Sequence, residues 1–104
     1  MIHITLYASA IKIEGHAFFD NPGHDIVCAG VSAIVFGGIN YFEQNEVKIV
    51  KDDENSLIFL ELLEVNLKNL TAINVMKTQL WVIAKVYDKN IKIIDETNKI
   101  VTGK

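Results

Sequence analysis

The chain has 104 residues, of which half are hydrophobic and 22% are charged, so its composition predicts one globular domain over residues 1–104 and excludes a disordered chain. The net charge is −3 and all ten basic residues are Lys, which argues against a phosphate-binding surface and excludes bidentate Arg contacts with carboxylate or phosphate. The single cysteine cannot form an internal disulfide, which favours a reducing compartment.

The first five residues lack a basic region and alternate like a strand, so we expect no signal peptide. The longest uncharged run covers residues 26–42, which is slightly short for a membrane span and contains three glycines. We interpret this run as a buried helix. The sequence therefore predicts a cytoplasmic protein with no membrane partner.

Apolar and polar residues alternate at the start of the chain, as in half-buried strands. The alternation predicts strands over 2–7 and 11–14, which pair as a hairpin and lead into the tripeptide GHA at 15–17. The segment 18–23 then has strong turn chemistry, because Pro22 interrupts both strands and helices.

A helix is expected next, from Asp25 to Tyr41, with Asp25 as its N-cap. Its apolar residues occur all round the helix, which predicts burial on more than one side. Gly30, Ala33 and Gly37 form a stripe of small residues that would let another backbone approach closely.

The second half of the chain repeats this alternation of strands and helices. We expect a strand starting at Val47, an acidic turn over 52–55, a strand over 57–63, a helix over 69–88 and a strand over 91–94. The order β-β-α-β-β-α-β predicts an α+β fold, in which two long helices pack on a mostly antiparallel sheet of about five strands.

The residues that could carry chemistry are concentrated between positions 15 and 32, which include two histidines, two aspartates and the only cysteine. If Asp25 is the N-cap, Cys28 lies in the first helical turn, where unpaired N–H groups and the helix dipole favour the nucleophilic thiolate. The same N–H groups would form an oxyanion hole. The turn can bring His16 over the helix start, where its imidazole would activate the thiol.

Position alone leaves other interpretations open. A lone cysteine in an apolar helix is more often a small core residue, and Asp25 is more often only a cap. Ser32 is by default a helix hydroxyl that bonds back to a carbonyl. A zinc or thiol-redox site is a further alternative, although the segment lacks a paired-ligand spacing. Its ligands would be His16, His24, Asp25 and Cys28.

The tripeptide GHA, a short glycine-containing loop and the run DIVCAGVSAI at 25–34 together resemble the signature of the ribosomal-processing cysteine protease (Prp) family. The resemblance implies a catalytic dyad of His16 and Cys28 that hydrolyses a peptide bond without a metal or organic cofactor. It implies supporting roles for Asp25 and Ser32. The implied substrate is the precursor of a large-subunit ribosomal protein, the twenty-seventh of the L series, which loses its N-terminal extension by a cut after phenylalanine.

Two further expectations concern the substrate and the assembly. The loop between the histidine and the helix is expected to cover a bound peptide as a lid, and its residues of interest are Phe18, Phe19, Pro22 and Gly23. A homodimer is expected from the apolar second helix, the small-residue stripe and the resemblance. We expect no direct contact with nucleic acid. The competing interpretation is a non-catalytic ribosome- or protein-binding module, in which Cys28 only packs.

Overall fold

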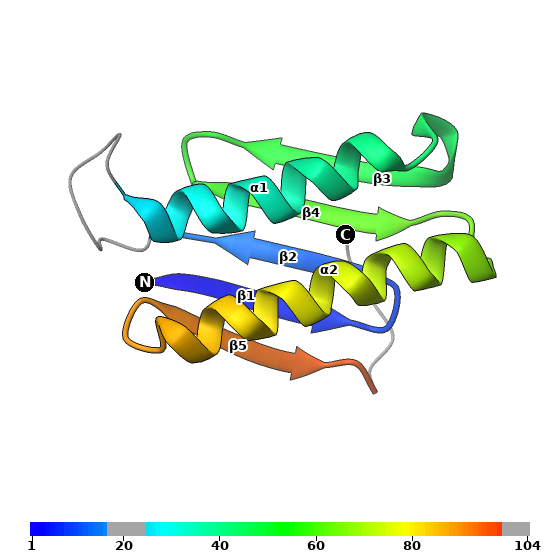
Figure 1. The fold of residues 1–104 in the computed structure, drawn as a ribbon. Helices are drawn as coiled ribbons and strands as arrows, with labels where there is room; N and C mark the ends of the chain where they lie inside the picture. The colour runs from blue at the N-terminus through cyan, green and yellow to red at the C-terminus, as the bar shows by residue number, and fades with distance from the viewer. Residues whose placement is uncertain (17–24, 99–104) are drawn as a thin grey trace.

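The computed structural model describes residues 1–16 and 25–98, and its elements follow the predicted order (Figure 1). The strands are β1 (Ile2–Tyr7), β2 (Ala10–Glu14), β3 (Val47–Asp52), β4 (Leu57–Leu62) and β5 (Ile91–Glu96). The helices are α1 (Ile26–Tyr41), the short 3₁₀ helix η1 (Gln44–Glu46) and α2 (Leu67–Val86). No helix within these residues is long and apolar enough to cross a membrane.

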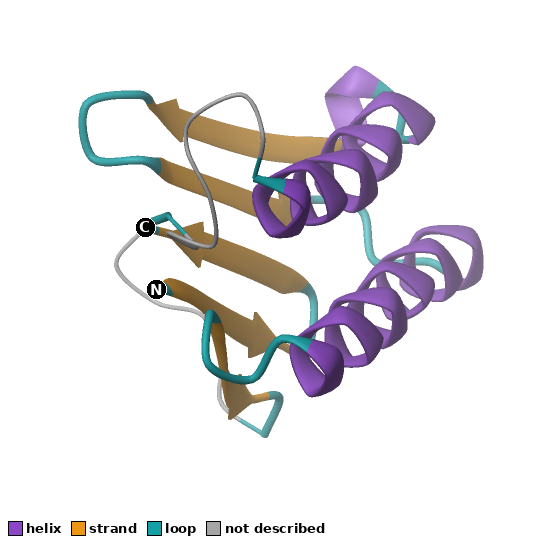
Figure 2. Cartoon of the chain, turned by 60° about the vertical axis from the view of Figure 1, so that its left-hand side comes forward, coloured by secondary structure: helices purple, strands orange, loops and turns teal. Residues whose placement is uncertain are grey.

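The strands form a single five-stranded sheet in the order β3-β4-β2-β1-β5. β1 pairs with β2, β2 with β4 and β4 with β3 in antiparallel fashion, whereas β1 and β5 are parallel, with Ile2 opposite Ile91. Both long helices lie on the same face of this sheet (Figure 2). The predicted α+β fold with a mostly antiparallel sheet is confirmed.

The core lies between the sheet and the two helices. Alternate residues of β1, such as Ile4 and Leu6, are buried there, and α2 contributes Ile73 and Leu80. The residues of α1 that join this core form a single row, namely Val27, Val31 and Val35.

The sequence predicts that α1 is buried on more than one side, and this holds for two sides. One side packs on the sheet through the row described above, and another packs on α2, where Gly30 and Gly38 meet side chains of that helix. The outward side is exposed, because no other element among residues 1–16 and 25–98 covers it (Figure 2). Ile26 and Tyr41 are 56% and 55% exposed, and Phe36 is 37% exposed.

Small residues bring the two helices close, but not those of the predicted stripe alone. A methyl group added to Gly30 would lie 2.5 Å from Cδ1 of Ile83, and one added to Gly38 would collide with the side chain of Met76. Nothing lies within 4 Å of the same position at Gly37. Within this chain the close approach therefore occurs at Gly30 and not at Gly37, and the prediction missed Gly38.

Two buried polar side chains fix α2 to its surroundings. Asn69 donates from Nδ2 to Oε1 of Glu46 and to the carbonyl oxygen of Glu64, both at 3.0 Å. Lys77 is 8% exposed and donates from Nζ to the carbonyl oxygen of Ala8 at 3.0 Å. These contacts attach α2 to η1, to the segment after β4 and to the turn between β1 and β2.

Candidate active site

The start of α1 is fixed by the cap that the sequence predicts. Asp25 has an extended backbone, and its Oδ1 accepts hydrogen bonds from the backbone N–H groups of Val27 and Cys28, both at 3.0 Å. This arrangement satisfies donors that a helix start leaves unpaired. It also occupies the N–H of Cys28, so that group can stabilise an oxyanion only if the substrate oxygen displaces the carboxylate of Asp25.

A pocket of about 420 Å³ lies beside the first turns of α1, where β2 ends and β3 turns into β4. His16, half-buried Cys28 and exposed Ser32 all line it. Of the four residues to which the resemblance gives catalytic or supporting roles, the structure thus brings three together in one pocket. Asp25 does not line the pocket; its side chain caps α1 instead.

The backbone just before His16 is held in a conformation that requires glycine. Gly15 has a φ of 91°, and a methyl group added to it would collide with the carbonyl oxygen of Met1. The N–H of Gly15 donates to the carbonyl oxygen of Ser56 at 3.0 Å. The side chain of His16 is fixed by the same residue, because its Nε2 lies 2.6 Å from Oγ of Ser56.

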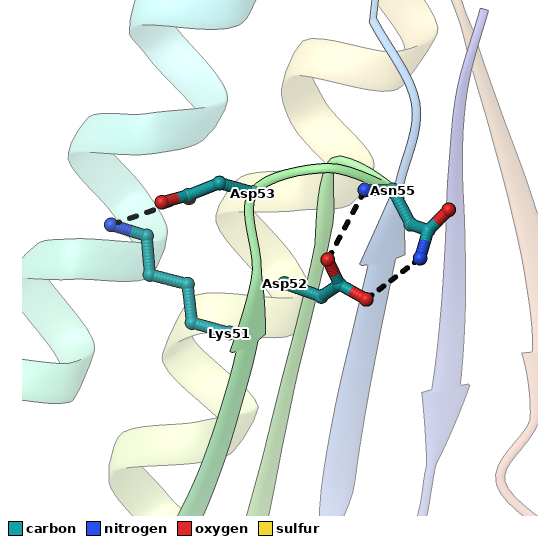
Figure 3. Close-up of polar contacts among 4 residues, drawn as sticks. All are labelled: Lys51, Asp52, Asp53 and Asn55. Carbon is teal, nitrogen blue, oxygen red and sulfur yellow. Dashed lines mark hydrogen bonds and ion pairs between the residues drawn. The ribbon is translucent and has the colours of Figure 1, made fainter.

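The turn between β3 and β4 also lines the pocket. Asp52 accepts hydrogen bonds from the backbone N–H of Asn55 at 3.3 Å and from its Nδ2 at 2.7 Å (Figure 3). Nζ of Lys51 lies 3.7 Å from Oδ1 of Asp53. The hydrogen bonds from Asn55 lower the pKa of Asp52.

Sequence reasoning recognised this segment as an acidic turn but missed its place in the site. Lys51, Asp52, Asp53 and Ser56 all line the pocket. No local signal marks them, because the contact with His16 spans 40 residues of sequence and depends on the pairing of β2 with β4. Only the sheet order places the turn opposite Cys28.

The pocket combines reactive groups with an apolar floor. Ile2, Ile13, Val31 and Val35 form that floor, whereas the thiol, the imidazole and the charged turn lie around it. A thiol and an imidazole in one partly apolar pocket suit attack on the backbone of a peptide whose apolar side chain enters the floor.

Part of the predicted site lies outside the described residues. This holds for the substrate loop, with Phe18, Phe19, Pro22 and Gly23, and for His24, which the zinc alternative requires. Over residues 1–16 and 25–98, no group of three or more His, Cys, Asp or Glu side chains is placed to hold a metal ion.

Comparison with known proteins assigns the family. The family model described as "Cysteine protease Prp" matches residues 1–92. The chain belongs to this family. It is therefore a cysteine protease, and its lone thiol lies in the pocket described above. Membership in the Prp family confirms the resemblance drawn from the GHA and DIVCAGVSAI segments.

Individual relatives support the assignment along most of the chain. The chain is 35% identical over 96 residues to the ribosomal processing cysteine protease Prp of Mycoplasma pneumoniae, covering 92% of this chain and 96% of the relative. It is 34% identical over 97 residues to that of Mycoplasma genitalium, covering 93% and 98%. A crystal structure of the Staphylococcus aureus protease with a covalently linked product peptide superposes with a TM-score of 0.85 at 26% identity, covering 92% of this chain and all of that one.

Proposed function

We propose that this chain is a ribosomal-processing endopeptidase in which Cys28 is the nucleophile and His16 the general base. The observation that carries the proposal is the shared pocket, which joins the only thiol of the sequence to an imidazole beside a helix start. Asp25 caps the helix that carries Cys28, and Ser32 lines the pocket from the next turn of the same helix. All of this lies in a single protease domain.

In the proposed reaction, His16 takes the proton of Cys28, and the thiolate attacks the carbonyl carbon of the scissile bond. The imidazolium then protonates the leaving amine as the carbon–nitrogen bond breaks, which leaves a thioester on Cys28. His16 next activates a water molecule that hydrolyses the thioester and regenerates the thiol. Each step is an acid–base or acyl-transfer step, so no redox group is required.

The proposed substrate is the precursor of a large-subunit ribosomal protein, the twenty-seventh of the L series, cut after phenylalanine. The support comes from relatives named as ribosomal processing proteases, one of which was crystallised with a substrate peptide. The apolar floor of the pocket fits a phenylalanine side chain. A ribosomal precursor also supports a cytoplasmic location, where a single reduced cysteine persists.

The decisive experiment measures cleavage of the purified precursor by mass spectrometry. Cys28→Ala and His16→Ala are each expected to abolish cleavage while retaining the fold, because the dyad acts as a unit. His3→Ala on β1 and His24→Ala serve as matched imidazole controls and are expected to remain active. Full activity in Cys28→Ala would end the proposal, and loss only in His24→Ala would reassign the base.

We also propose that two copies associate through the outward groove between α1 and α2. This groove has a volume of about 780 Å³, is largely apolar, and is lined by residues such as Tyr41, Val75 and Leu67, the last of which is 82% exposed. Light scattering at micromolar concentration is expected to give the dimer mass. Leu67→Glu should give a monomer, whereas Val82→Glu, outside the groove, should not. A monomeric parent chain would refute this.

A further inference from the structure

We propose that Ser56 is the positioning residue for His16, and that its hydroxyl accepts a hydrogen bond from Nε2–H so that Nδ1 becomes the nitrogen that takes the proton of Cys28. This inference rests on the proposed dyad and adds a third member, which comes from the turn before the neighbouring strand β4. The contact itself is short, with 2.6 Å between Oγ and Nε2. Hydrogen bonds of this length restrict the rotation of the imidazole.

Ser56 holds both the ring and the backbone of the histidine segment. Its carbonyl oxygen accepts from Gly15 N–H at 3.0 Å, directly before His16. The imidazole and the chain that carries it are therefore fixed against one residue of the β3–β4 turn. This double attachment fixes His16 at an exposed position of the chain.

The backbone of Ser56 makes a purely structural role a poor explanation. Its φ is 49°, and it is the one non-glycine residue with positive φ within residues 1–16 and 25–98. Glycine or asparagine adopts this conformation more readily than serine. Serine at a left-handed position is expected where its side chain is needed, since backbone strain of this kind concentrates at functional sites.

Only one direction of the hydrogen bond supports catalysis. If the hydroxyl donated to Nε2, the ring proton would be on Nδ1, and neither nitrogen would be able to take the thiol proton. If Nε2–H donates to the hydroxyl, Nδ1 is the basic nitrogen. The imidazolium formed after proton transfer still donates from Nε2 to the same oxygen, so the contact persists through the reaction.

Other titratable groups line the pocket with His16, and any effect they have must be separated from that of the hydroxyl. They are Cys28 on α1, Lys51 and Asp52 on β3, and Asp53 in the turn. None of these is altered by substitution at Ser56. A change in the histidine on removal of the hydroxyl is therefore attributable to the hydroxyl or to the backbone of the turn.

Two substitutions separate these causes. Ser56→Gly removes the hydroxyl and suits the positive φ, whereas Ser56→Ala removes the hydroxyl and retains the strain. If the hydroxyl positions His16, both variants should lose about tenfold in kcat, the expected effect of one hydrogen bond to a group that becomes charged, with little change in KM. Ser56→Gly should be at least as stable as the parent chain, which removes misfolding as an explanation.

A second readout does not depend on activity. Nitrogen-15 NMR of the Cys28→Ala protein, recorded at a pH at which the spectrum itself reports a neutral ring, should place the His16 proton on Nε2, with the signals assigned by their absence in His16→Gln. Adding Ser56→Gly should give a mixture of tautomers. A proton on Nδ1 in the parent, or tautomers unchanged by Ser56→Gly, would overturn the proposal.

The outcomes distinguish the two proposals. Normal kcat in Ser56→Gly, measured beside an inactive His16→Ala, would overturn the positioning role and leave the dyad intact. Activity retained in His16→Ala would overturn both. A loss confined to Ser56→Ala would assign the effect to the backbone of the turn and would also overturn the role of the hydroxyl.

Discussion

At the scale of single residues, Asp25 meets two opposing requirements. Its carboxylate stabilises the start of α1 through the N–H groups of Val27 and Cys28. An oxyanion hole at the same place would need at least one of those donors. The cap and such a hole would therefore compete for the same donor, and a substrate oxygen would have to displace the carboxylate of Asp25. If Cys28 is the nucleophile, the start of α1 can serve it in this way only when the cap is displaced.

Asp25→Ala is expected to lower the unfolding free energy by about 1 kcal/mol, because two backbone donors lose their acceptor. Asp25→Ser keeps a capping oxygen and should lose only a few tenths of that value. Urea unfolding monitored by circular dichroism measures both variants. Equal losses for the two substitutions would show that the charge, and not the cap, is what stabilises the helix.

At the scale of elements, the contact between α1 and α2 depends on glycines that look alike in the sequence. Gly37→Ala is expected to raise the unfolding free energy by roughly 0.5–1 kcal/mol, because it gains helix propensity and meets nothing within 4 Å. Gly38→Ala places its methyl group against Met76 and should be less stable than Gly37→Ala.

Thermal unfolding of these adjacent variants provides the measurement. They differ by one position along the same helix, so each is the control for the other. Similar stability in both would mean that Met76 moves aside without loss. That result would reduce the role of close helix packing in this fold.

The same helices show what could be predicted from the sequence. Alternation and capping placed the five strands and the two long helices in order, because these signals are local. The exposure of the outward side of α1 was not predicted, because an apolar helix does not reveal which of its faces the sheet and α2 leave uncovered. Ser56 was missed for a similar reason, since its contact with His16 depends on the order of strands and not on a pattern within one segment.

At the scale of the whole molecule, the dependence of stability on pH should carry the signature of one buried lysine. Burial lowers the pKa of Lys77 from its ordinary value of 10.5, and the charge of Asp95 offsets only part of this. The unfolded chain then binds more protons than the folded chain between the lowered pKa and 10.5. The free energy of unfolding therefore contains a contribution from Lys77 that increases with pH across this window.

Lys77→Met removes this contribution, so the unfolding free energy of the parent chain minus that of the variant should increase from about pH 7 to pH 10. Lys85→Met, at an exposed position of the same helix, should follow the parent chain across that range. Chemical denaturation at several pH values measures the difference. A difference that stays constant or decreases with pH would contradict the assigned effect of burial.

The parallel pairing of β1 with β5 has a consequence for how the protein is made. Ile2 lies opposite Ile91, so β1 has to wait until all the intervening elements have been synthesised before its parallel partner exists. Contacts this distant in sequence form slowly, and the β5-facing edge of β1 is exposed on the nascent chain in the meantime. Because Ile2 also lines the pocket, we expect the pocket to reach its final form only after β5 has been synthesised and has paired with β1.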